Sequence, residues 1–143
     1  MFKTCSLLRP LLVVAVSSAA AIGLPSCGGS SGGGPQVNGT WDSFSAKVTP
    51  GTASAGKITF NVTNAAAIEH EFVVLKTDTP QEQLAVGADG KVPELGKVGE
   101  IAEFKGPNVS KKLTLDLKPG KYVLVCNTPG HYQKGIHVGF TVQ

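Results

Sequence analysis

The stretch Cys126-Asn127-Thr128-Pro129-Gly130-His131-Tyr132-Gln133-Lys134-Gly135-Ile136 decides how the rest of this chain is interpreted. Cys126 ends an apolar run that begins at Tyr122, and His131 follows it on the same short loop. A thiolate and an imidazole suit copper better than hard cations such as magnesium or calcium. Because the loop holds only two such donors, a third ligand must come from elsewhere. The best donor in the sequence is His70.

Outward from this loop, the sequence predicts short strands separated by Gly and Pro turns. Residues 57–64 and 111–117 alternate strictly between apolar and polar side chains, as half-buried strands do. Residues 70–76, 122–126 and 136–142 have the same period, while 99–105 and the loosely alternating 40–48 are weaker. No helical period is sustained, so the fold class is all-β, a sandwich or barrel of one domain.

Some positions in this pattern carry specific expectations. His70 shares a face with the core positions Phe72 and Val74, because alternate residues of a strand point the same way. Trp41 and Phe44 are the large residues of 40–48. Thr79 followed by Pro80 predicts the start of a short helix, with Thr79 as N-cap, inside an otherwise irregular segment.

The N-terminal part of the sequence predicts export and a lipid anchor. Lys3 and Arg9 precede an uncharged apolar run over 11–24, which is typical of a signal peptide. The run ends in a segment similar to the bacterial lipoprotein box, with Cys27 as the residue to be lipidated. We therefore expect a signal peptide over 1–26, lipidated Cys27 with a flexible Gly/Ser linker over 27–36, and the folded domain over 37–143.

Cysteine and charge counts narrow the function. Of the 3 cysteines, Cys5 lies in the predicted signal and Cys27 in the anchor, which leaves Cys126 as the folded domain's only thiol. An unpaired thiol in an oxidising compartment favours a metal site. Removing Lys3 and Arg9 leaves 11 basic residues against 10 acidic ones. This balance indicates neither nucleic-acid binding nor a strongly charged partner.

The C-terminal part of the chain resembles the cupredoxins, the plastocyanin and azurin class. The resemblance rests on the run from Pro119 into Cys126, on the Pro129-Gly130-His131 motif and on the closing Phe140-Thr141-Val142. His70 stands where that family places its first ligand. The resemblance implies a Greek-key β-sandwich of about seven to eight strands. It also implies one copper ion bound by His70, Cys126 and His131.

One position departs from the family pattern. Cupredoxins usually have an axial methionine where this chain has Ile136, which has no donor atom. Met1, the chain's only methionine, lies in the predicted signal. The resemblance to multicopper oxidases that carry an aliphatic residue here implies a three-coordinate copper of high reduction potential. Gln133 and the backbone carbonyl of Glu69 are alternative axial donors that we rank lower.

Four other residues lie close to the predicted ligands in sequence. His137 is out of phase with Ile136, so it should face away from the metal. Glu69 and Glu71 flank His70 on the opposite phase and are expected to be solvated. Many cupredoxins have an asparagine at the position of Glu71 that ties the two ligand loops together. Asn127 is the alternative source of that hydrogen bond.

These inferences predict an electron-transfer protein outside the cytoplasm, tethered to a membrane through its lipid. We expect a monomer that serves redox partner proteins, with the edge of His131 ringed by Pro129, Gly130, Tyr132 and Ile136. The alternative is a lipoprotein that handles Cu(I) for delivery or tolerance. We expect no enzyme, because catalysis at the metal needs an open position for substrate, and no two-copper centre, because that needs two bridging cysteines.

Overall fold

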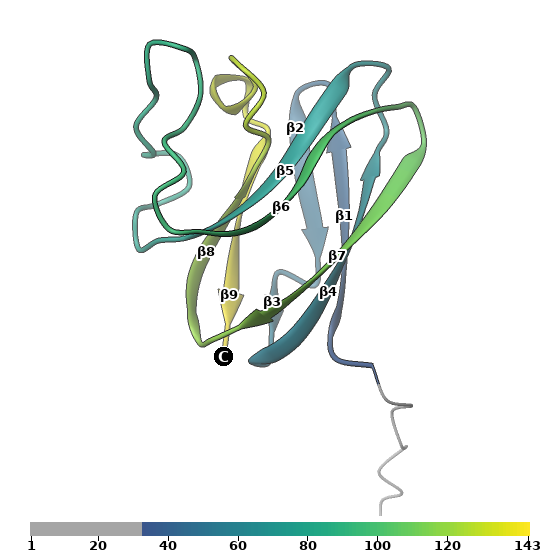
Figure 1. Cartoon of the computed structure of the whole chain (residues 1–143), viewed down its shortest axis with the longest axis vertical. Coiled ribbons are helices and arrows are strands. Elements are labelled where there is room, and N and C mark those ends of the chain that lie inside the picture. Colours follow the sequence, from purple (N-terminus) through teal and green to yellow (C-terminus); the bar gives the residue numbers. More distant parts are fainter. Residues whose placement is uncertain (1–32) are drawn as a thin grey trace, which may run out of the picture. The chain divides into compact units, whose positions relative to one another are not determined.

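The computed structural model describes residues 33–143, which fold into nine β-strands and one short 3-10 helix. The strands form a four-stranded sheet in the order β2-β1-β4-β7 and a five-stranded sheet in the order β3-β9-β8-β5-β6 (Figure 1). Their bounds are β1 Gln36–Asp42, β2 Ser45–Thr49, β3 Thr52–Ala53, β4 Gly56–Asn64, β5 Glu69–Lys76, β6 Lys97–Lys105, β7 Val109–Leu117, β8 Gly120–Val125 and β9 His137–Val142, with η1 at Tyr132–Lys134.

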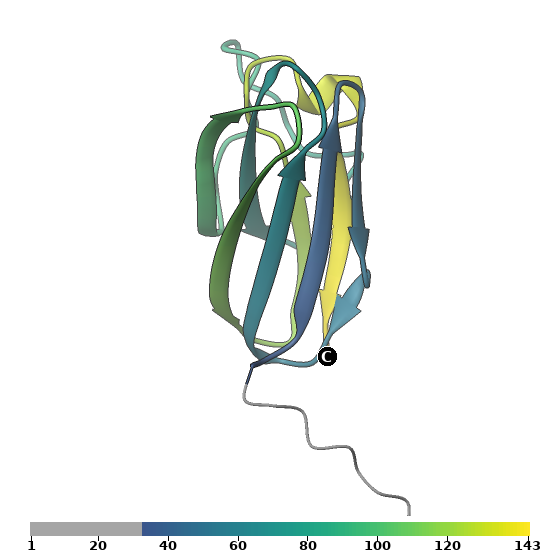
Figure 2. The same cartoon turned by 90° about the vertical axis from the view of Figure 1, so that its right-hand side faces the viewer.

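Both sheets are mixed. β1 pairs in parallel with β4, and β3 pairs in parallel with β9, while the other pairs are antiparallel. In Figure 2 the four-stranded sheet faces the viewer, and β9 (yellow) of the other sheet is visible behind it. The predicted single-domain, all-β Greek-key sandwich is therefore confirmed, with nine strands instead of the expected seven to eight. No helix within residues 33–143 is long and apolar enough to cross a membrane.

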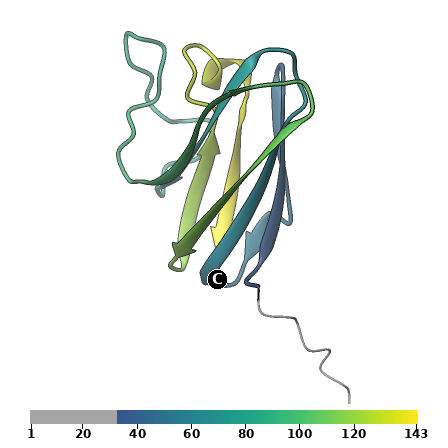
Figure 3. The ribbon, with the colours of Figure 1, turned by 45° about the vertical axis from the view of Figure 1, so that its right-hand side comes forward.

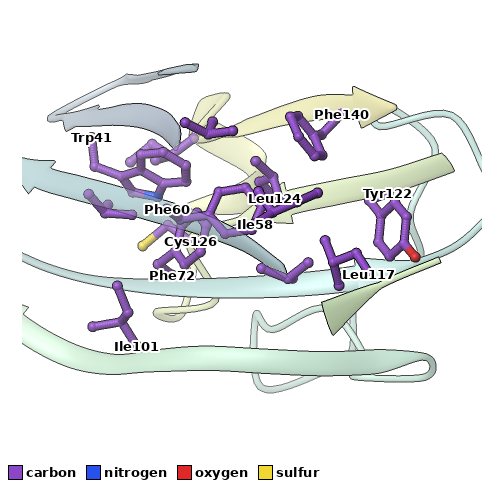
Figure 4. Close-up of a cluster of buried hydrophobic side chains, with 14 of the residues drawn as sticks. Trp41, Ile58, Phe60, Phe72, Ile101, Leu117, Tyr122, Leu124, Cys126 and Phe140 are labelled. Atoms are coloured by element: carbon purple, nitrogen blue, oxygen red, sulfur yellow. The ribbon is translucent and has the colours of Figure 1, made fainter. Parts of the chain in front are cut away.

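The core lies between the two sheets and follows from the alternation in the sequence. Ile58, Phe60 and Val62 of β4 are all buried against the other sheet. Trp41 meets Phe72 edge to face, with ring centroids 5.0 Å apart, a geometry that stabilises aromatic pairs beyond their buried area. Figure 4 shows that Cys126 lies among these core side chains.

Two sequence expectations are wrong. Residues 40–48 are a hairpin of β1 and β2, and Phe44 is 70% exposed in the turn that joins them. No helix begins at Thr79, because residues 77–96 form an irregular excursion between β5 and β6. This excursion covers the outer face of the five-stranded sheet. It buries a second cluster that includes Val73 and Leu75 of β5 and its own Val92.

Strand directions bring several loops to one end of the sandwich. Trp41 near the end of β1 pairs with Asn64 at the end of β4, and Asn64 also pairs with Val109 at the start of β7. In the other sheet Val125 at the end of β8 pairs with Val73 of β5 and with His137 at the start of β9. The β1–β2, β4–β5, β6–β7 and β8–β9 connections therefore share this end, at the top of Figure 3.

Candidate metal centre

Two strand ends and one loop bring the predicted ligands together. His70 is the second residue of β5, Cys126 directly follows β8, and His131 precedes η1 in the β8–β9 connection. Because β5 and β8 are antiparallel neighbours, the start of the first strand lies beside the end of the second. The sheet thus places an imidazole and a thiol, 56 residues apart in the chain, in contact.

The donor atoms of the three side chains lie close enough to hold one ion. Nδ1 of His70 is 3.4 Å from Sγ of Cys126, and Nδ1 of His131 is 3.3 Å from the same sulfur. First-row metals bind imidazole nitrogen at about 2.0–2.1 Å and thiolate sulfur at about 2.3 Å, so the nitrogen and sulfur ligands of a trigonal site lie about 3.7–3.8 Å apart. The observed nitrogen–sulfur spacings are roughly 0.3–0.5 Å shorter than this. Within residues 33–143 no fourth His, Cys, Asp or Glu joins this group.

Hydrogen bonding alone does not account for this arrangement. Sulfur is a weak donor and a weak acceptor, yet two buried imidazoles turn their Nδ1 atoms toward it. Nε2 of His70 is buried and has no hydrogen-bond partner among residues 33–143. Two imidazoles and one thiolate are the trigonal donor set of a blue-copper site. The residues present therefore fit a copper ion.

Electrostatics keep the histidines in the form that binds metals. Burial lowers the pKa of His70 below its ordinary value of 6.5, and the charge of a protonated His131 would lower this pKa further. Burial, helped by Lys134, also lowers the pKa of His131. Both imidazoles are thus neutral at neutral pH, as ligation requires.

The same burial shifts the pKa of the thiol in the opposite direction. Burial raises the pKa of Cys126 above its ordinary value of 9.0, while the backbone amides of Glu71 and Thr128 oppose this shift. The amide of Glu71 donates to Sγ at 3.3 Å. These amides would share the charge of the thiolate that a bound metal ion stabilises.

Apolar packing closes the side of the site that faces the core. Cys126 and Ile136 are fully buried and belong to one hydrophobic cluster with Trp41 and Phe72. The backbone carbonyl of Ile136 accepts from the amide of Cys126 at 3.0 Å. The backbone amide of Ile136 donates to the carbonyl of His131 at 3.3 Å. Ile136 is therefore tied through its backbone to two of the three candidate ligands.

The expectation that Glu71 is solvated is wrong. Only 8% of its surface is exposed, and its Oε2 is buried without a hydrogen-bond partner among the described residues. Burial raises the pKa of this carboxyl group, and Lys91 opposes the shift. Carboxylate oxygens of Glu94 and Glu100 lie near it, and both of these residues form ion pairs with Lys97. The sequence did contain a signal for this burial: residues 72–75 are all apolar, as in a strand that is covered on both faces.

Asn127 ties the ligand loop to the excursion and makes no bond to the β4–β5 loop. Its Oδ1 accepts from the amide of Val92 at 2.8 Å, and its Nδ2 donates to the carbonyl of Val92 at 3.0 Å. Nδ2 also donates to a carboxylate oxygen of Glu94 at 3.1 Å. The direction of this bridge was not predictable, because residues 77–96 have no periodic pattern.

The remaining predicted neighbours lie outside the donor group. His137 faces away from it, as expected, and packs against the ring of Tyr132 in a tilted arrangement, with ring centroids 4.7 Å apart. Gln133 is exposed on η1. The predicted ring of residues around His131 is only partly present, because Tyr132 and Ile136 are buried while Pro129 is exposed.

A mixed β-sandwich with a His-Cys-His group at one end defines a cupredoxin-type domain, the class that binds a single copper. The family model that matches is the sulfocyanin (SoxE) domain, over residues 29–143, and the chain belongs to that family. No curated protein matches the chain at a significant level.

Solved structures similar to this one include two auracyanins and rusticyanin. Auracyanin from Roseiflexus castenholzii has a TM-score of 0.54 and 21% identity, and the match covers 78% of this chain and 99% of that one. Auracyanin B has a TM-score of 0.56 and 17% identity, with 80% and 92% covered. Rusticyanin from Thiobacillus ferrooxidans has a TM-score of 0.52 and 21% identity, with 77% and 79% covered. At these identities the likeness shows the fold.

Proposed function

We propose that this protein transfers electrons with one copper ion bound by His70, Cys126 and His131. The observation that carries the proposal is the contact of two Nδ1 atoms with one sulfur, at 3.4 and 3.3 Å, at the edge of an apolar core. Copper supplies the chemistry by cycling between Cu(I) and Cu(II), one electron at a time. The chain's own residues hold the ligands, exclude water and share the thiolate charge.

Rigid positioning suits this task. His70 lies within β5 and Cys126 is one residue beyond β8, so backbone pairing on both strands resists their separation. Fast electron transfer requires that little moves when the charge changes. The apolar packing around Cys126 and Ile136, with no donor atom on Ile136, supports a three-coordinate site that favours Cu(I) and has a high potential.

The surface over the site supports docking of a redox partner. His131 is the only one of the three residues with any exposed surface, at 8%. This end of the sandwich also exposes Phe44 in the β1–β2 turn, Ile68 in the β4–β5 loop and Val109, the first residue of β7. Such apolar residues suit brief association through a small interface. They come from three separate segments of the chain, which is why the motif around His131 did not indicate them.

Membrane tethering through Cys27 is part of the proposal. The lipoprotein-like sequence supports it, and Cys27 lies outside the described residues. β1 begins at Gln36 and runs in parallel with β4 toward the end that holds the copper ligands. A linker that leads into Gln36 would therefore join the domain at the end opposite to the site. This arrangement leaves the docking surface free for partners outside the cytoplasm.

A visible absorption spectrum tests the proposed function. The copper-loaded protein should show an intense blue or green Cu(II) band that bleaches with dithionite, and Cys126→Ser should lack the band. A colourless copper complex would contradict the proposal.

Full burial of Cys126 and His70 disfavours the alternative, delivery of Cu(I), because ligand exchange requires access to the sulfur. Slow loss of copper to a chelator, with fast electron self-exchange, is therefore expected. Rapid loss would favour delivery.

A further inference from the structure

Residues 77–96, here called the strap, form a long excursion without regular structure between β5 and β6. Its base is closed by a hydrogen bond from the amide of Lys76 to the carbonyl of Gly96, at 2.9 Å. Structureless loops of this length are uncommon in small domains and usually have a function. The strap therefore needs an explanation beyond connecting two strands.

The strap is attached to the Cys126–Ile136 loop at three places. Asn127 makes the bonds to Val92 and Glu94 described above. The amide of Gly130 donates to the carbonyl of Gly90 at 2.9 Å. The third attachment is the hydroxyl of Tyr132, which accepts from the strap at one amide and donates to it at one carbonyl. Figure 3 shows the strap beside the loop that carries η1.

Tyr132 makes two of the attaching hydrogen bonds through a single hydroxyl. Its hydroxyl accepts from the amide of Leu84 at 2.9 Å and donates to the carbonyl of Gln81 at 2.8 Å. The side chain of Gln81 in turn accepts from the amide of Gly139 on β9. The ring of Tyr132 packs in the cluster that the strap buries, together with Val92.

Each attached loop residue is a sequence neighbour of a candidate copper ligand. Asn127 follows Cys126, while Gly130 and Tyr132 stand on either side of His131. The loop's own bonds near His131 are local: the amides of Lys134 and Ile136 donate to its carbonyl, at 3.1 and 3.3 Å. Local bonds shape the turn but do not fix it against the sheet. The strap supplies that fixation from outside.

We propose that the strap holds the Cys126–Ile136 loop in its copper-binding geometry, with Asn127 and Tyr132 as positioning residues. The part that concerns copper rests on the proposed function, whereas the holding of the loop does not. Each hydrogen bond restrains the loop against opening, so the loss of both bonds of the Tyr132 hydroxyl should raise the frequency of local opening about tenfold.

The test compares Tyr132→Phe with Tyr122→Phe in the full folded domain. Tyr122 is a matched control, because its hydroxyl donates to the carbonyl of Lys118 at 2.7 Å, at the end of β8 remote from Cys126. Both substitutions remove one hydroxyl and keep the ring. In the copper-free protein, amide hydrogen exchange over 128–136 should become about tenfold faster in Tyr132→Phe and stay unchanged in Tyr122→Phe. Unchanged exchange in Tyr132→Phe would overturn the strap's role.

A second arm uses the copper-loaded protein. Transfer of copper to a chelator should be about tenfold faster in Tyr132→Phe, and the intensity ratio of its visible bands should change, with neither effect in Tyr122→Phe. Faster exchange with unaltered spectrum and copper transfer would overturn the assignment of Tyr132 as a positioning residue. If neither variant nor the wild type binds copper, the proposed function fails, and the exchange arm still decides whether the strap holds the loop.

Asn127→Asp gives an independent check of the attachment at Asn127. The substitution keeps the shape and the acceptor for the amide of Val92, but it removes both donated bonds and puts a carboxylate beside Glu94. Exchange near Thr128 should accelerate at least as much as in Tyr132→Phe. Exchange at the wild-type rate would contradict the strap's role at this attachment.

Discussion

Replacing Ile136 by methionine would place a thioether at the position where a cupredoxin's axial ligand is expected. The backbone of Ile136 is bonded to Cys126 at 3.0 Å and to His131 at 3.3 Å, so the new side chain starts from a point fixed to both ligands. Ile136 is fully buried, and the exchange nearly conserves volume. Substitutions of this kind in a core usually cost less than about 1.5 kcal/mol.

The expected result of Ile136→Met is a lower reduction potential. An added donor stabilises the higher charge of Cu(II) more than that of Cu(I). If the thioether prefers Cu(II) by a factor of about 10 to 100, the potential falls by about 60–120 mV, since a tenfold change corresponds to about 59 mV for one electron. The Cu(II) spectrum should change with it, because the site is no longer trigonal.

The assay is a redox titration followed in the visible spectrum, with Val138→Met as the control. Val138 lies two residues further along on the same face and packs against the same core. At about 3.3 Å per residue, its thioether would start roughly 6–7 Å further from the ligands. Equal shifts in the two variants, or none in Ile136→Met, would show that Ile136 does not occupy the axial position.

Two other predictions follow from buried titratable groups. Glu71→Gln should raise the Tm of the copper-free protein at pH 7 by a few degrees, on the order of 1 kcal/mol, because burial raises the pKa of the Glu71 carboxyl and disfavours its charge. The gain should vanish below pH 4.5, where the unfolded chain is also protonated, and a pH-independent gain would contradict this cause. In denaturant unfolding of the copper-free protein, the free energy of unfolding should decrease as the pH is lowered past 6.5. Burial lowers the pKa of His70 and His131 in the folded protein, so at these pH values the unfolded chain binds more protons than the folded one. The free energy of unfolding should fall again above pH 9, since burial raises the pKa of Cys126 and the unfolded thiol ionises first; a flat profile would refute both assignments.

Much of the sandwich was predictable from local pattern. Alternation at Ile58, Phe60 and Val62 predicted a half-buried strand, and β4 has that strand's buried face. The same period put His70 in phase with Phe72 and Val74, and this phase proved correct: Phe72 and Val74 lie in the main core with Cys126, which His70 contacts. A strand's side chains alternate between its faces whatever its neighbours are, so this information is local and survives in the sequence.

Irregular segments were not predictable in this way. Thr79 and Pro80 predicted a helix that does not form. The side chain of Glu71 was expected in solvent, but it is buried beside Glu94 of the strap. The bridge from Asn127 to Val92 joins residues 35 apart, one of them in a segment with no period. Such contacts depend on how loops pack against a finished sheet, which no local pattern encodes.

The sequence by itself determined the donor types: one thiol in the folded domain, two histidines in suitable phase, and an isoleucine where an axial donor is expected. Only the tertiary structure decided that these donors meet. Antiparallel pairing of Val73 with Val125 sets the start of β5 beside the end of β8 and so brings His70 to Cys126. Side-chain chemistry is a property of each residue, whereas the distance between two residues is set by the register of the strands that carry them.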